Sequence, residues 1–204
     1  MTLVKICGIT DAGDARLAAD AGADAVGFVF AESPRRVVVE QARTISIALP
    51  ENVIRVGVFV NEEPGEVLRI SREAGLDLAQ LHGDETPEAV TAVREGGVKV
   101  MKALRVKSTA SLEALDEYEA DLILLDAHSA KARGGTGERF DWEVAKYLRG
   151  RDNIVVSGGL GPGNVREAIE FFEPFGVDAS SSLEDGPGRK NGELVWRFVL
   201  AAKG

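Results

Sequence analysis

The fold class is decided by the stretch Leu3-Val4-Lys5-Ile6-Cys7-Gly8-Ile9-Thr10-Asp11 at the start of the chain. Its apolar residues predict a strand over Leu3–Cys7, and Gly8 then turns the chain. Thr10-Asp11 is a helix-start signal, because such side chains accept hydrogen bonds from the free N–H groups of a first helical turn. The stretch is therefore a strand, a turn and the start of a helix, and Cys7 stands at the carboxyl end of the strand.

The same unit recurs along the whole chain. Strands are predicted over Leu3–Cys7, Asp24–Phe30, Val53–Val60, Asp77–Leu81, Val98–Leu104, Asp121–Asp126, Asn153–Ser157 and Val177–Ser181. Helices are predicted over Asp11–Ala21, Val39–Leu49, Glu66–Ala74, Pro87–Glu95, Ser111–Tyr118, Trp142–Leu148, Asn164–Phe172 and in a last segment that reaches Leu200. Near-continuous apolar strands indicate burial on both faces, and their alternation with helices predicts parallel strands with right-handed crossovers. Eight such units predict an α/β fold, a single-domain (β/α)8 TIM barrel over residues 1–204 and near the lower size limit of that fold.

A doubly wound open sheet is the competing fold. Its first turn between strand and helix would carry a G-x-G-x-x-G phosphate-binding fingerprint, and Cys7-Gly8-Ile9-Thr10 does not. No stretch rich in Pro, Gly or Ser divides the chain into two domains. The longest irregular stretch spans 127–141, which we expect to be a mobile cover over the active site, with an ordinary surface loop as the alternative.

Composition excludes several classes of protein. The chain has 204 residues, of which 45% are hydrophobic and 28% charged, as in ordinary globular proteins. Its net charge of −9 argues against nucleic-acid binding. No apolar run is long enough to cross a membrane, and the first strand begins too early to leave room for a signal peptide. A single cysteine forms no internal disulfide, so we expect a cytoplasmic protein.

Two residues at predicted strand ends form a candidate acid/base pair. Cys7 ends the first strand, and Asp126 ends the apolar run Leu122-Ile123-Leu124-Leu125 of the sixth. In a barrel these strands face each other across the mouth where active sites lie. One group could take a proton from carbon while the other protonates an oxygen. The alternatives are a small buried hydrophobe for Cys7 and a helix cap or loop anchor for Asp126.

Two further strand ends carry backbone donors for an anion. Ser157-Gly158-Gly159-Leu160 follows the seventh strand, and Ser180-Ser181-Ser182-Leu183-Glu184 follows the eighth. Backbone N–H groups in such turns, with the start of a short extra helix, are the recurrent phosphate site of barrels. Phosphate contacts are therefore predicted from Gly158, Gly159, Ser180, Ser181 and Ser182, although glycines also simply turn a chain. No metal site is predicted, because the two histidines lack partners at ligand spacing.

Five motifs together resemble the phosphoribosylanthranilate isomerase family, and they occur over essentially the whole chain in the family's order. They are Lys5-Ile6-Cys7-Gly8-Ile9-Thr10, Gln80-Leu81-His82-Gly83, Leu124-Leu125-Asp126, Ser157-Gly158-Gly159-Leu160 and Val177-Asp178-Ala179-Ser180-Ser181. The resemblance implies a cofactor-free isomerase of tryptophan biosynthesis on a (β/α)8 barrel. Its reaction would be the Amadori rearrangement of N-(5′-phosphoribosyl)anthranilate to 1-(2-carboxyphenylamino)-1-deoxyribulose 5-phosphate.

The resemblance also implies roles for single residues. Cys7 matches the general base and Asp126 the general acid. Arg36 matches an arginine that binds the anthranilate carboxylate, for which a guanidinium offers a planar fork of donors; without the resemblance it would be a solvated loop charge. Asp178 is expected to meet the ribose hydroxyls. Apart from the resemblance, His82 is expected to be a structural loop histidine with its ring hydrogen-bonded to backbone, with a catalytic role as the alternative.

One position departs from the family pattern. Ser182 stands where the family usually has glycine. If that glycine had a positive φ, serine would cost on the order of 1 kcal/mol, and its hydroxyl could add a phosphate contact.

The expected partner is a small phosphosugar substrate, with neither nucleic acid nor membrane, and both a monomer and a homodimer stay open. Two other functions also stay open. Another aminoaldose–ketose isomerase of the same barrel type would place a carboxylate where Cys7 stands. A barrel that only binds a phosphorylated metabolite would need no acid/base pair.

Overall fold

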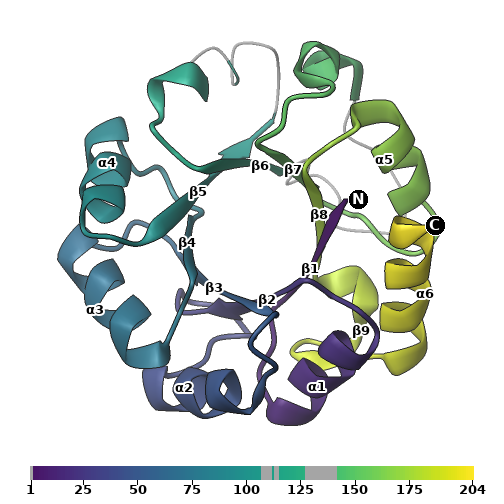
Figure 1. Ribbon diagram of the computed structural model, residues 1–204, viewed down its shortest axis with the longest axis horizontal. Coiled ribbons are helices and arrows are strands. Elements are labelled where there is room, and N and C mark those ends of the chain that lie inside the picture. The colour runs from purple at the N-terminus through teal and green to yellow at the C-terminus, as the bar shows by residue number, and fades with distance from the viewer. Residues whose placement is uncertain (1, 107–111, 113–114, 127–141) are drawn as a thin grey trace.

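The computed structural model describes residues 2–106, 112, 115–126 and 142–204. Eight parallel strands form a closed barrel in chain order, and the helices surround it (Figure 1). The strands are β1 (Leu3–Cys7), β2 (Ala25–Val29), β3 (Ile54–Phe59), β4 (Leu78–Leu81), β5 (Lys99–Arg105), β6 (Leu122–Asp126), β7 (Ile154–Ser157) and β8 (Gly176–Ala179). Each overlaps its predicted range. The (β/α)8 barrel is thus confirmed, and the open sheet is excluded because β1 pairs with β8.

The α-helices follow the predicted positions closely. They are α1 (Ala12–Asp20), α2 (Val39–Ala48), α3 (Pro64–Ala74), α4 (Pro87–Glu95), α5 (Val165–Phe172) and α6 (Gly192–Lys203). The segment predicted as a helix after β6 is instead the 3-10 helix η2 (Trp142–Leu148). The helix predicted over 111–118 lies partly outside the described residues, and the cover predicted over 127–141 lies wholly outside them. No helix in the described part of the chain is long and apolar enough to cross a membrane.

The segment after β8 differs from its prediction. The strand ends at Ala179, and the chain continues as the short 3-10 helix η3 (Ser181–Leu183). An antiparallel hairpin of β9 (Glu184–Gly186) and β10 (Arg189–Lys190) then precedes α6. These strands are too short to show the alternation from which a sequence-based prediction recognises a strand.

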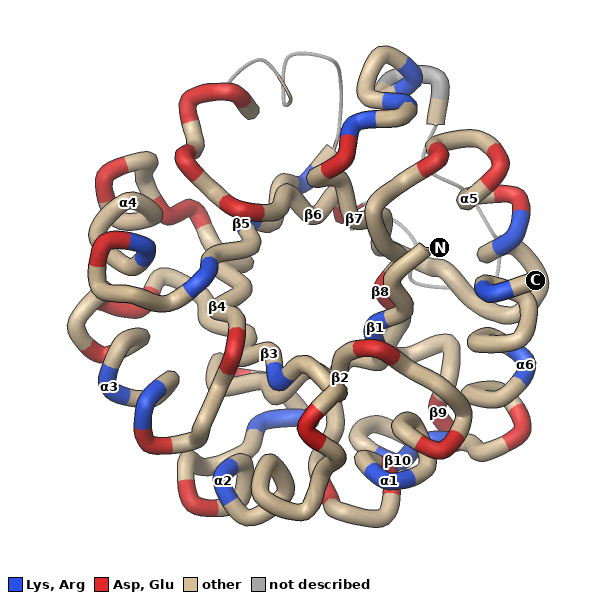
Figure 2. The backbone as a smooth tube through the Cα atoms, in the orientation of Figure 1, with Lys and Arg blue, Asp and Glu red and all other residues tan. Residues whose placement is uncertain are grey.

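The barrel wall separates two apolar regions. Along β1, Val4 and Ile6 belong to the outer cluster between strands and helices, whereas Lys5 and Cys7 face the interior, because successive strand residues alternate. The interior layer consists of Ala25, Val56, Leu78, Met101, Ala103, Leu124 and Val155. Charged residues of both signs lie mainly in the outer layer (Figure 2). A buried interior charge such as Lys5 therefore needs a specific partner.

Candidate active site

A hollow of about 220 Å3 lies at the carboxyl ends of the strands. It is lined by Cys7, Val29, Ser33, Arg35, Val58, Gln80, His82, Asp126, Ser157–Leu160 and Asp178–Ser182. The structure thus brings together the predicted acid/base pair, Asp178 and all five predicted phosphate-binding residues. Arg36 is not among the lining residues, whereas its neighbour Arg35 is.

Cys7 lies at the end of β1 and is 8% exposed. It pairs in register with Gly27 of β2, and the backbone N–H groups of Gly8 and Ile9 both donate to the Gly27 carbonyl. Gly8 has a φ of +78°, which a glycine adopts without strain and which turns the chain directly after the thiol. Burial raises the pKa of Cys7, and the nearby Lys5 ammonium opposes that rise.

Lys5 lies one layer below Cys7 inside the barrel and is fully buried. Its Nζ donates to Oδ1 of Asp178 at 2.8 Å, and the other oxygen of that carboxylate accepts from Oγ of Ser157 at 3.0 Å. The sequence predicts that Asp178 contacts the ribose. That contact would therefore use the remaining lone pairs of the Asp178 carboxylate. The sequence analysis did not predict the contact of Lys5 with Asp178. The available signal was its place two residues before Cys7, since alternate strand residues share a face.

Asp126 ends β6 and lies beside His82. Its Oδ2 is 3.0 Å from Nε2 of His82, whose Nδ1 is 2.7 Å from Nε2 of Gln80. An amide N–H that donates to Nδ1 leaves the imidazole proton on Nε2, directed at the Asp126 carboxylate. The prediction that the His82 ring bonds to backbone is therefore wrong, because its partners are side chains. The ring links β4 to the proposed acid on β6.

The two loops that the sequence predicts to bind phosphate contact each other directly. Gly158 and Gly159 after β7 have φ values of +86° and +72°, so this turn requires glycine-like backbone. Oγ of Ser182 in η3 donates to the carbonyl of Leu160, which joins the loop after β8 to the loop after β7. Ser182 does not have a positive φ. The strain that would attend a serine in a left-handed position is therefore absent.

Ser182→Gly is expected to change KM by less than about tenfold and to leave kcat nearly unchanged. The substitution removes the hydroxyl bond to Leu160 but keeps the backbone N–H that the phosphate would need. Steady-state kinetics of the purified variant measure both parameters. A large fall in kcat would show that the serine shapes the position of the reacting groups.

The two adjacent arginines after β2 have different environments. Arg35 forms a bidentate pair with Glu184, with Nε–Oε1 at 2.8 Å and Nη2–Oε2 at 2.6 Å, and its side chain lies against Gly8. Glu184 is held further by Lys190, whose Nζ is 2.8 Å from Oε1. Arg36 is exposed, and its backbone forms a parallel bridge with Val29. The Arg35 guanidinium is thus already paired with the Glu184 carboxylate. The role predicted for Arg36 stays a prediction.

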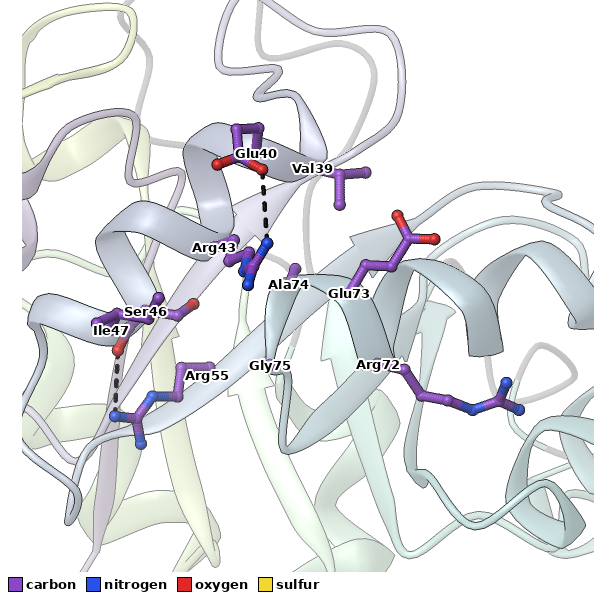
Figure 3. Close-up of a pocket in the computed structure, with 10 residues that line it drawn as sticks. All are labelled: Val39, Glu40, Arg43, Ser46, Ile47, Arg55, Arg72, Glu73, Ala74 and Gly75. Atoms are coloured by element: carbon purple, nitrogen blue, oxygen red, sulfur yellow. Dashed lines mark hydrogen bonds and ion pairs between the residues drawn. The ribbon is translucent and has the colours of Figure 1, made fainter.

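Larger hollows lie away from these groups. One of about 510 Å3 opens at the amino ends of the strands. Another, of about 640 Å3, lies between α2 and α3 (Figure 3). There the Arg55 guanidinium donates to backbone carbonyls at the end of α2, among them those of Ser46 and Leu49, and Arg43 pairs loosely with Glu40. Neither hollow is lined by a residue that the sequence predicts for the site. Among the described residues, no group of three His, Cys, Asp or Glu side chains is placed to hold a metal ion.

Comparison with known proteins agrees with this geometry. The family model of N-(5′-phosphoribosyl)anthranilate (PRA) isomerase matches residues 4–201. The N-(5′-phosphoribosyl)anthranilate isomerase of Rubrobacter xylanophilus is 66% identical over the whole of both chains. The crystal structure of phosphoribosyl anthranilate isomerase from Thermotoga maritima superimposes with a TM-score of 0.92 at 44% identity, covering all of both chains. A second isomerase structure, in complex with reduced 1-(o-carboxyphenylamino)-1-deoxyribulose 5-phosphate, covers both chains fully with a TM-score of 0.88 at 43% identity. The family predicted from the five motifs is confirmed: the chain belongs to the N-(5′-phosphoribosyl)anthranilate isomerase family.

Proposed function

We propose that Cys7 and Asp126 are the general base and the general acid that isomerise N-(5′-phosphoribosyl)anthranilate in this protein. Membership of the family makes the protein an aldose–ketose isomerase of tryptophan biosynthesis. One observation carries the assignment of roles. A thiol from β1 and a carboxyl from β6 line the same hollow, whose rim is formed by the two phosphate loops. A phosphosugar bound by those loops would place its reacting carbons between the two groups.

The reaction then follows from the chemistry of these groups. Asp126 donates its proton to the furanose ring oxygen as the bond from that oxygen to C1′ breaks, which opens the sugar and leaves an iminium. The iminium carbon is the electron sink for the next step, so no cofactor is needed. The Cys7 thiolate takes the proton from C2′, and the C–H electron pair moves toward the iminium to give an enolamine. Tautomerisation of the enolamine gives the ketose product.

The remaining predicted residues hold the substrate in this proposal. Backbone N–H groups of Gly158, Gly159 and the Ser180–Ser182 segment bind the phosphate, because they supply donors without adding positive charge to an acidic protein. Arg36 binds the anthranilate carboxylate from its exposed position beside the hollow, and Asp178 meets the ribose hydroxyls. Binding at both ends of the substrate fixes the carbons that react.

The function is tested by complementation of a tryptophan auxotroph that lacks this isomerase, together with turnover by the purified protein. We expect growth without tryptophan and formation of the ketose product. A plasmid carrying the Cys7→Ala/Asp126→Asn variant is the matched negative control. Saturable binding of substrate without product would contradict the proposal.

Arg36→Met is expected to raise KM by about ten- to hundredfold while kcat changes little, because a charge-assisted bidentate bond contributes roughly 1.5–3 kcal/mol and its partner is remote from the reacting carbons. Steady-state kinetics separate the two parameters. The KM of Arg36→Lys should lie between those of the unchanged protein and Arg36→Met, because lysine keeps the charge but loses the planar fork of donors. Arg43→Met, which removes an exposed arginine of α2, is the control and should leave both parameters unchanged. A fall in kcat alone would place Arg36 at the reacting atoms instead.

A further inference from the structure

A buried ammonium lies directly beneath the only cysteine of the chain. Lys5 and Cys7 occupy alternate positions of β1, so both side chains face the barrel interior. Lys5 is 0% exposed, and its ammonium donates a hydrogen bond to Asp178 at 2.8 Å and lies close to the Cys7 sulfur. A lysine is rarely buried so completely unless its charge is compensated, and here the Asp178 carboxylate compensates it.

The strand register fixes this arrangement. Lys5 pairs with Asp178 across the β1–β8 seam, and Cys7 pairs with Gly27 across the β1–β2 seam. A Cβ atom added at Gly27 would lie 2.7 Å from Sγ of Cys7 and 3.2 Å from Nζ of Lys5. Both atoms therefore occupy the space that the missing side chain leaves free. Glycine on β2 permits the sulfur and the ammonium to lie side by side.

Other charges also face the thiol, but they are placed differently. Asp178 comes from β8, Lys190 from β10, and Arg35 from the segment after β2. Lys190 and Arg35 both bind Glu184, whose carboxylate offsets their charge. Of the charged groups facing the thiol, Lys5 is the one whose Nζ shares with the sulfur the space over Gly27. Burial is the largest influence on the pKa of Cys7 and raises it, whereas Lys5 lowers it and Asp178 raises it.

We propose that Lys5 is a positioning residue for Cys7, and that its ammonium, held by Asp178 and fitted beside Gly27, stabilises the thiolate that takes the C2′ proton. The proposal rests on the proposed role of Cys7 as the base. In the step itself the C2′–H bond breaks and an S–H bond forms. Lys5 keeps its proton throughout, and its charge compensates the sulfur before the transfer. The effect on turnover therefore acts through Cys7.

The single cysteine makes a direct test possible. The rate of alkylation by iodoacetamide, followed across pH in the free enzyme, reports the thiolate of Cys7 without any turnover. In Lys5→Met we expect alkylation at pH 7 to fall at least about tenfold and its inflection to move to higher pH. The kcat at pH 7 should fall by a similar factor and recover in part at alkaline pH. Loss of packing alone would lower kcat without moving the inflection.

A second variant separates the loss of the Lys5 charge from the effect of misfolding. Lys5→Met leaves Asp178 as an unpaired buried carboxylate, which is destabilising in itself. Lys5→Met/Asp178→Asn removes both charges, so it should fold more readily. Because Lys5 affects the thiol more strongly than Asp178 does, we expect alkylation to change in the same direction but less, by at least about threefold. Circular dichroism and thermal unfolding establish that each variant is folded.

Lys102 provides a matched control. It is 1% exposed on β5, and its Nζ lies 2.6 Å from Oε2 of Glu85, so Lys102→Met removes a buried ion pair of the same kind away from the thiol. We expect alkylation of Cys7 to be unchanged in this variant. An unchanged inflection in the folded Lys5 variants, or an equal shift in Lys102→Met, would overturn the proposal. If Cys7→Ala kept full turnover, the role of Cys7 as base would fail instead, and the alkylation result would be unaffected by that failure.

Discussion

Replacement of Cys7 by alanine is expected to lower kcat by at least about 10²-fold, because general-base catalysis typically contributes 10²–10⁴-fold and alanine cannot accept the C2′ proton. The substitution removes only the sulfur from a buried position, so folding and ligand binding should be largely kept. The residual activity should fall as pH rises, since Asp126 must still be protonated to act as the acid. Steady-state kinetics across pH measure both effects.

The outcome separates a base from a structural thiol. A buried cysteine that only packs would cost stability when shortened and would leave kcat near its original value. Near-normal kcat in the folded Cys7→Ala variant would therefore show that the proposed mechanism is wrong. Cys7→Ser is a useful companion, because it keeps the size of the side chain while replacing the thiol by a far weaker acid.

Asp126→Asn is expected to lower kcat by at least about 10²-fold as well, since the amide has nearly the shape of the carboxyl but cannot protonate the ring oxygen. The pH dependence should be opposite to that of Cys7→Ala. The remaining activity should rise with pH as the Cys7 thiolate forms, and it should keep rising above the ordinary thiol range because burial raises the pKa of Cys7.

An exposed aspartate supplies the control for this variant. Asp20 lies on α1, where it pairs with Arg16 at 3.0 Å, and Asp20→Asn should leave the whole pH–rate profile unchanged. If Asp126→Asn and Cys7→Ala instead altered the profile in the same direction, the two residues would not be acid and base. A different donor, with His82 beside Asp126 as the nearest, would then have to protonate the ring oxygen.

The fold could be predicted from the sequence because its signal is local and repeated. A strand buried on both faces needs a continuous apolar run. Runs of this kind predicted β1 and β6. The hairpin of β9 and β10 was missed, because strands of two and three residues leave no periodic pattern. Its position depends instead on long-range bonds, such as the one that Asp14 of α1 accepts from the backbone N–H of Lys190.

The site could be predicted only in part. Motifs at strand ends were enough to bring Cys7 and Asp126 to one mouth, because parallel strands of a barrel end on the same side. The contact between His82 and Asp126 depends on side-chain rotamers. The spacing of residues along the sequence does not predict those rotamers. The bond between Lys5 and Asp178 joins residues 173 positions apart, so the sequence around either residue could not predict it.

That bond also constrains the order in which the protein assembles. Lys5 belongs to the first strand of the barrel, and Asp178 belongs to the eighth. An ammonium cannot enter a dry barrel interior at an acceptable cost in free energy before its carboxylate arrives. Insertion of β8 and burial of Lys5 should therefore be a single late event, in keeping with the slow formation of contacts between distant parts of a chain. The surroundings of the Cys7 thiol are therefore complete only when β8 pairs with β1 and closes the barrel.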